Sequence, residues 1–233
     1  MVNIDTVYQR VLALANKEQR GYITPQEFNL FANQAQMDIF EQYFYDINQF
    51  GRLPGNSTGG SDMLDYLEEK IDYFKEERNI NINNTNEFYN IGGAISDLYK
   101  IDSVIYNSTY TCEQVNSNQV RNMISSRLYA PTSYNPIYEI KRSNRLFLYP
   151  SGLQEAITVN YIRKPKTAQW SGLPVSGANL YNSNESIDFE LHPSEETKLV
   201  FKILQLAGVS MKDNNLYQIG SAEDNKNIQQ EKQ

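Results

Sequence analysis

A long amphipathic helix pattern near the N-terminus is the strongest constraint on how this 233-residue chain folds. Thr24-Pro25-Gln26-Glu27 predicts the helix start, because threonine can cap free backbone amides, proline suits the first turn and Glu27 completes a capping box. A wide, largely aromatic face follows at spacings of three and four: Phe28, Phe31, Ala35, Ile39, Tyr43 and Ile47. A face this wide must be buried, so other elements are expected to cover it.

Similar patterns predict three more helices. Residues 4–15 carry one apolar stripe, residues 64–74 form a helix with an acidic outer face in DYLEEKIDYFKEER, and Pro193-Ser194-Glu195-Glu196 opens an apolar run. The segment FGRLPGNSTGGSD, residues 50–62, is typical of a flexible linker. The apolar positions of the three helices are Ile4, Val7, Val11, Leu14; Leu64, Leu67, Ile71, Phe74; and Leu199, Val200, Ile203, Leu204, Leu206, Ala207.

The pattern changes to short strands near residue 98. Residues 79–90 are rich in asparagine and look irregular, residues 116–128 indicate a short helix or a long connection, and residues 163–184 indicate a long excursion. The predicted strands are Leu98–Tyr106 with Thr109–Val115 as a first pair, followed by Ile137–Lys141, Leu146–Tyr149 and Ala156–Ile162.

These elements predict an α+β fold. The expected architecture is a helical bundle, made of N-terminal helices and a returning C-terminal helix, with a β-rich antiparallel insertion. The expected boundaries are 1–78 for the N-terminal helices, 79–190 for the insertion, 191–213 for the returning helix and 214–233 for a tail or docking segment.

Composition excludes several classes of function. A net charge of −7 argues against nucleic acid as the main affinity partner, because such binders need a basic surface. A Cys/His zinc site needs about four ligands, and the chain offers only Cys112 and His192, far apart in sequence. With one cysteine no disulfide can form within the chain. The absence of a long apolar run and of a signal segment predicts a soluble protein.

No motif predicts catalysis, a cofactor or a metal, so the chain is not expected to be an enzyme. Residues 16–27 have the frame of a calcium loop, but Arg20 stands at a ligand position, so a turn and capping box is the favoured reading. The glycine-rich residues 55–60 lack the lysine of a phosphate loop. His192 precedes a helix and suggests a local structural role, while the carboxylates of residues 65–78 suggest a solvated face rather than an acid–base pair.

Two sets of residues are candidates for partner contact. One is the basic group near the strand ends, which fits an acidic partner, a passing nucleic-acid backbone or a plain solvated turn. The other lies in the polar C-terminal tail, which fits a short helix or a segment that orders on a partner. The first set is Lys141, Arg142, Arg145, Arg163, Lys164 and Lys166, and the second is Leu216, Tyr217, Ile219 and Ile228.

Three segments together carry a resemblance to a known family. They are VLALANKEQRGYITPQEFN at residues 11–29, ITVNYIRKP at residues 157–165 with Trp170 after it, and DFELHPSEE at residues 188–196 with the helix that follows. The chain resembles the head–tail connector or ring proteins of podovirus-type phages, especially the crAss-like group. None of the three segments is a catalytic signature.

The resemblance implies a structural virion protein that forms a ring of about twelve copies between portal and tail. Implied partners are further copies of the chain, the portal protein or an adjacent ring, downstream tail proteins, and DNA only as it passes through the channel; no membrane is implied. The implied location is the neck or tail of the virion, after assembly in the host cytoplasm. Alternatives are an accessory glycan- or receptor-binding domain of a tail and, less favoured, a glycoside hydrolase using paired carboxylates.

Overall fold

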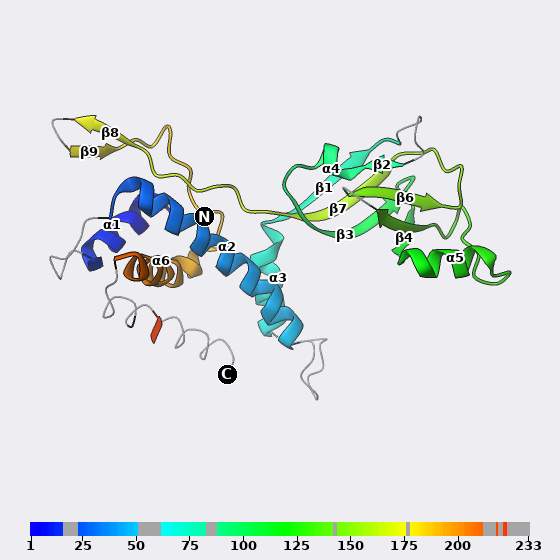
Figure 1. The fold of residues 1–233 in the computed structure, drawn as a ribbon, viewed down its shortest axis with the longest axis horizontal. Coiled ribbons are helices and arrows are strands. Elements are labelled where there is room, and N and C mark those ends of the chain that lie inside the picture. Colours follow the sequence, from blue (N-terminus) through cyan, green and yellow to red (C-terminus); the bar gives the residue numbers. More distant parts are fainter. Residues whose placement is uncertain are drawn as a thin grey trace. The chain divides into compact units, whose positions relative to one another are not determined.

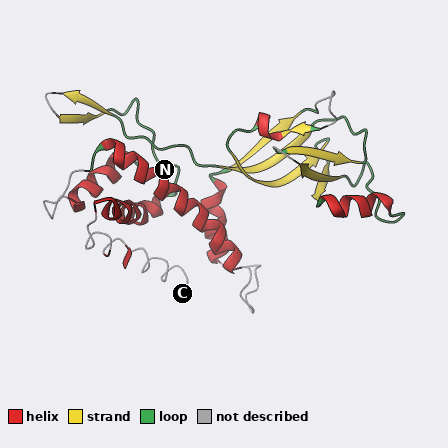
Figure 2. Cartoon of the chain, in the orientation of Figure 1, coloured by secondary structure: helices red, strands yellow, loops and turns green. Residues whose placement is uncertain are grey.

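The computed structural model describes residues 1–15, 23–50, 62–82, 88–141, 144–175, 178–211, 218 and 221–222. The fold is α+β, as the sequence predicted. The chain divides into two compact units, which we call the helical unit (Met1–Tyr73 and Pro165–Gln233) and the β unit (Phe74–Lys164). Figure 1 identifies the elements, and Figure 2 shows the long helices in the first unit and most strands in the second.

The helical unit joins segments from both ends of the chain. Its helix α6 packs against α1 and α2, while α3 packs against α2. The start of α2 is as predicted: the backbone N–H of Thr24 donates to Glu27 Oε2 (3.0 Å), and the N–H of Glu27 donates to Thr24 Oγ1 (3.3 Å). The helices are α1 (Ile4–Ala15), α2 (Pro25–Phe50), α3 (Asp62–Asp72), the 3₁₀ turn η2 (Pro193–Glu195) and α6 (Glu196–Met211).

A row of amide side chains on α2 holds an extended segment, residues 166–170. Asn33 Nδ2 donates to the carbonyl of Ala168 (2.9 Å), and its Oδ1 accepts from the Ala168 N–H (2.8 Å). One helical turn earlier, Asn29 makes the same two bonds to Trp170, at 3.0 and 2.8 Å. Two asparagines four positions apart on the helix therefore each bond the N–H and the carbonyl of every second residue of the extended segment, as a neighbouring β-strand does. We call this arrangement, together with Gln36 described below, the amide ladder.

The β unit is built on a seven-stranded mixed sheet in the order β1-β7-β3-β4-β5-β6-β2. Only the pair β4–β5 is parallel among the described strands. The elements are β1 (Lys75–Ile80), β2 (Tyr89–Asn90), α4 (Ile91–Ala94), β3 (Leu98–Tyr106), β4 (Tyr110–Gln114), α5 (Ser117–Ser125), β5 (Ile137–Lys141), β6 (Arg145–Tyr149) and β7 (Ile157–Arg163).

The core of the β unit gathers apolar side chains from every strand of this sheet. Strand β7 lies between β1 and β3 and buries residues on both of its faces, which explains its nearly continuous apolar sequence. The buried cluster consists of Ile80, Tyr89, Ile91, Ile95, Val104, Tyr106, Cys112, Tyr138, Leu146, Leu148, Ile157, Val159 and Tyr161.

Three expectations need correction. Residues 75–80 continue the acidic helix pattern in sequence, but they form the edge strand β1, whose charged side chains suit a sheet edge and whose backbone pairs with β7. The insertion is mixed rather than antiparallel, because the connection through α5 returns the chain parallel to β4. The excursion at 163–184 contains a hairpin, β8 (Gly172–Val175) with β9 (Ala178–Tyr181).

The expected insertion of residues 79–190 is also wider than the β unit of the structure. The β unit begins at Phe74 because β1 starts directly after α3. It ends at Lys164 because residues 166–170 pair with α2, and Val2 and Phe189 form a further backbone bridge within the helical unit. The segment from 165 to 190 therefore belongs to the helical unit.

Candidate interaction surfaces

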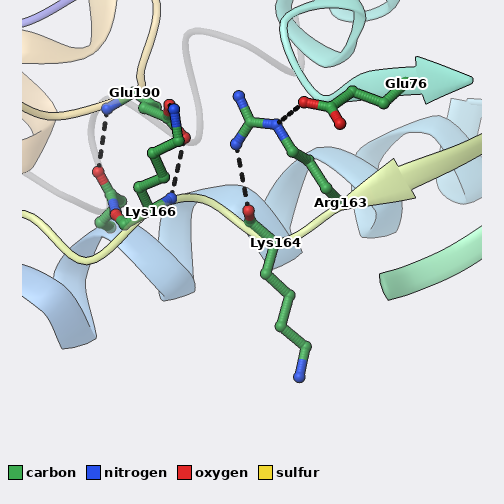
Figure 3. Close-up of polar contacts among 6 residues, drawn as sticks. Glu76, Arg163, Lys164, Lys166 and Glu190 are labelled. Atoms are coloured by element: carbon green, nitrogen blue, oxygen red, sulfur yellow. Dashed lines mark hydrogen bonds and ion pairs between the residues drawn. The ribbon is translucent and has the colours of Figure 1, made fainter. Parts of the chain in front are cut away.

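Arg163, at the end of β7, has a structural role in the β unit. Its Nε donates to Glu76 Oε1 at 2.8 Å, and its Nη1 donates to the Lys164 carbonyl at 3.3 Å (Figure 3). The guanidinium carbon lies 5.8 Å from the ring centre of Phe74. With only 8% of the residue exposed, Arg163 serves the fold rather than a partner. Lys164 is exposed, and Figure 3 shows its side chain pointing away from Glu76 and Arg163.

Lys166 belongs to the helical unit, where it continues the amide ladder. Gln36 Nε2 donates to the Lys166 carbonyl (2.8 Å), and Gln36 Oε1 accepts from the backbone N–H of Glu190 (3.2 Å). The carboxylate of Glu190 completes a ring of hydrogen bonds among Gln36, Lys166 and Glu190. Its Oε2 accepts from the Lys166 N–H (2.9 Å), and its Oε1 lies 3.4 Å from Lys166 Nζ (Figure 3). The backbone of Lys166 is thus fixed while most of its ammonium-bearing side chain stays in solvent.

The remaining basic candidates lie at the β5–β6 end of the sheet. Lys141 Nζ forms an ion pair with Glu139 and lies 4.8 Å from the ring centre of Phe147. The guanidinium of Arg145 lies 4.7 Å from the ring centre of Phe88. Strands β3 and β4 lie between β5 and β7, so these side chains and Arg163 stand on separated strands. Within the β unit, the structure therefore does not gather the described basic candidates into one patch. Arg142 lies outside the described residues.

A buried carboxylate, Glu139, holds α5 onto the sheet. Its side chain is 2% exposed and accepts hydrogen bonds from Ser117 Oγ (2.6 Å) and Tyr149 OH (2.5 Å), in addition to pairing with Lys141. Burial raises the pKa of Glu139, but the hydrogen bonds from Lys141, Ser117 and Tyr149 outweigh it and leave the pKa below its usual value. Glu139 is therefore charged at neutral pH and fixes the first residue of α5.

An exposed apolar surface extends from α5 into the loop that follows. Leu128 is 89% exposed, Tyr129 72% and Tyr134 74%, and Ile124 on α5 is also exposed. Arg121 and Arg127 flank these residues and are exposed as well. We call these six residues the α5 surface. Sequence reasoning missed it because residues 116–128 look like a polar connection; the only signal was two arginines and four large apolar residues in a stretch without acidic residues.

His192 has a local role, as predicted. It is the N-cap of η2, where its Nδ1 accepts from the Ser194 N–H (3.3 Å), and its ring packs edge-on against Tyr66. Next to it, Lys70 of α3 and Glu195 form an ion pair with both side chains 3% exposed. This pair ties α3 to the start of α6 within the helical unit.

Other predicted features fall elsewhere. The tail residues Leu216, Tyr217, Ile219 and Ile228 and the loop at 16–22 lie outside the described residues. Within the described chain, no three His, Cys, Asp or Glu side chains are placed to hold a metal ion, and none of the helices is long and apolar enough to cross a membrane. No known family model and no curated protein matches the sequence.

Proposed function

We propose that this chain is a structural subunit of a head–tail connector in a tailed phage. In this proposal it assembles into a ring between portal and tail and forms part of the channel through which DNA passes. The three sequence segments that resemble connector proteins motivate the proposal. The structural observation that supports it best is the α5 surface, because large apolar side chains exposed to 72–89% are costly for a free chain and useful in an assembly.

The anchoring of this surface fits an assembly role. Val120 is buried against the sheet, and Ser117 is bonded to the buried Glu139, so α5 presents its outer residues from a fixed base. A surface that is already ordered loses less entropy when a partner binds. In the proposed connector, such surfaces contact neighbouring copies, the portal-side ring and the downstream tail proteins.

The C-terminal tail supplies a second test of the proposal. Deleting residues 214–233 is expected to weaken assembly into particles while leaving the monomer folded, because the helices that pack against one another in the helical unit, α1, α2, α3 and α6, all lie before residue 214. Circular dichroism and size-exclusion chromatography measure the fold, and incorporation into particles measures assembly. Unfolding of the truncated monomer would contradict a docking role for the tail.

Quantitative peptide mass spectrometry on density-purified phage particles tests the proposal directly. We expect about a dozen copies per particle, in a constant ratio to portal peptides. Absence from intact particles would overturn the connector proposal and leave an assembly factor or host-directed protein as the next possibility to test.

The exposed tyrosines also favour a second candidate, an accessory glycan- or receptor-binding domain. Tyr129 and Tyr134 present rings to solvent, and Tyr134 packs edge-on against Tyr110 with 5.6 Å between ring centres. Exposed rings of this kind can stack on the apolar faces of sugars. Micromolar binding on a glycan array, lost in Tyr129→Ser and Tyr134→Ser, would support this candidate over the connector.

A further inference from the structure

We propose that the α5 surface docks on the exposed face of α3 in a second copy of this chain. The inference rests on the proposed connector function and names the contact that joins neighbouring subunits. Its two sides are different surfaces on different units of the chain, so copies can join head to tail: each copy offers one surface to one neighbour and the other surface to the next. Contacts of this kind generate rings when the rotation closes.

The first side combines apolar area with positive charge. Ile124, Leu128, Tyr129 and Tyr134 supply the apolar part. The segment 115–136 contains Arg121 and Arg127 and no acidic residue, although the whole chain carries a net charge of −7. The α5 surface is thus a local positive, apolar area on an acidic protein, and it favours an acidic partner.

The second side has the complementary charge. Asp65, Glu68, Glu69 and Asp72 are all exposed and follow helical spacings of three and four, so they share one face of α3. The lysine of this helix, Lys70, is buried in its pair with Glu195 and adds no charge to that face. We call these four carboxylates with the exposed ring of Tyr73 the α3 face.

Complementarity of charge selects a second copy as the occupant. The α3 face offers carboxylates to the two arginines and the ring of Tyr73 to the apolar residues, so both parts of the α5 surface find a counterpart. An ion pair at the rim steers association and sets register, while the buried apolar residues at its centre supply the affinity. The contact should accordingly weaken as ionic strength rises.

Charge reversal in the full-length chain tests the contact. Arg121→Glu with Arg127→Glu, or Glu68→Arg with Glu69→Arg, should each weaken self-association about tenfold or more in sedimentation velocity, since like charges then face one another. Combining all four changes in one chain should restore it. Lys100→Glu with Lys164→Glu makes the same change in net charge as the arginine pair, at exposed positions of the β unit outside the α5 surface, and should have little effect.

Photo-crosslinking identifies the partner surface. Leu128→p-benzoylphenylalanine changes a residue that is 89% exposed, so it should leave the fold intact. In a mixture of isotope-labelled and unlabelled chains, the expected crosslinks join position 128 of one copy to residues 64–73 of another. Crosslinks confined to one chain, crosslinks to other regions, or a wild-type chain that stays monomeric at its highest soluble concentration would each overturn the proposal.

These results are separable from the test of connector function. If the chain is present in particles at a fixed ratio but the reversed charges change nothing, the docking contact is wrong and the connector proposal stands. If the copies associate as described but the chain is absent from particles, the contact stands and the connector proposal fails.

Discussion

Replacing Glu139 with glutamine should destabilise the β unit by about 2–4 kcal/mol. Hydrogen bonds to a charged group contribute about 1.5–3 kcal/mol each, and the Ser117 and Tyr149 hydroxyls both donate to this carboxylate. Glutamine is neutral, so its Oε1 accepts only an ordinary hydrogen bond, and its NH₂ group can bond the other hydroxyl only if that hydroxyl turns to accept. Both bonds therefore fall to the neutral strength of about 0.5–1.5 kcal/mol, a loss of about 1–1.5 kcal/mol each. Lys141 is 44% exposed, so solvent screens its ion pair, which adds under about 1 kcal/mol.

Urea denaturation at neutral pH, followed by far-UV circular dichroism, measures the loss. Hydrogen exchange of peptides covering α5 should show faster exchange in Glu139→Gln, because Ser117, the first residue of the helix, loses its charged acceptor. Glu113→Gln on the neighbouring strand β4 is the matched control, since Glu113 is exposed, and it should stay within about 0.5 kcal/mol of wild type. Equal stability of the two variants would refute the reasoning.

The same variant has a pH signature with a definite sign. Because the native pKa of Glu139 is lowered, its contribution to stability is fully present above the ordinary glutamate pKa of about 4.3. The contribution is lost as pH falls from there through the native pKa. The difference in unfolding free energy between wild type and Glu139→Gln should therefore be constant near neutrality and shrink in acid.

Three further substitutions or reactions test other parts of the fold. Lys70→Met should lower the free energy of unfolding by about 3–5 kcal/mol, because Glu195 is left buried without its partner. Urea unfolding monitored by the fluorescence of Trp170 measures this loss, and adding Glu195→Gln should recover part of it. Asn33→Ala should cost about 1–3 kcal/mol in the same assay through its two lost bonds to the extended segment, whereas Asn48→Ala, exposed on the same helix, should cost much less. Burial raises the pKa of Cys112 to about 11, so at mildly alkaline pH a thiol reagent should react far more slowly with the native than with the denatured chain; a fast native reaction would contradict the burial.

Local signals in the sequence were sufficient for most elements. The capping box at Thr24 and Glu27 places the start of α2, and apolar alternation places β5 at Ile137–Lys141 with both bounds as predicted. Such features depend on residues close in sequence, so a pattern can reveal them. Strand β1 was missed because its backbone partner, β7, lies about eighty residues away and its own side chains are charged.

The candidate surfaces were harder to predict than the fold. In sequence, Leu128 and Tyr129 look like residues of an ordinary connection. Only the folded chain shows that both side chains are exposed and that no described residue buries them. Conversely, the sequence suggests that Arg163 is free to contact a partner. In the fold it pairs with Glu76 of β1, a strand far away in sequence that lies beside β7 in the sheet. Asn29 and Asn33 have the appearance of solvated helix positions, and only the folded structure shows them bonded to residues more than a hundred positions away.

The amide ladder has a mechanical consequence. The polypeptide passes between the units twice, after Tyr73 and after Lys164, and each passage is fastened inside the helical unit: the first by the ion pair of Lys70 just before it, the second by the ladder just after it. The ladder bonds run across the extended segment, as bonds between strands do. Tension along that segment therefore loads Asn29, Asn33 and Gln36 together in shear. Force along this segment would therefore have to break the hydrogen bonds of three side chains together rather than one after another.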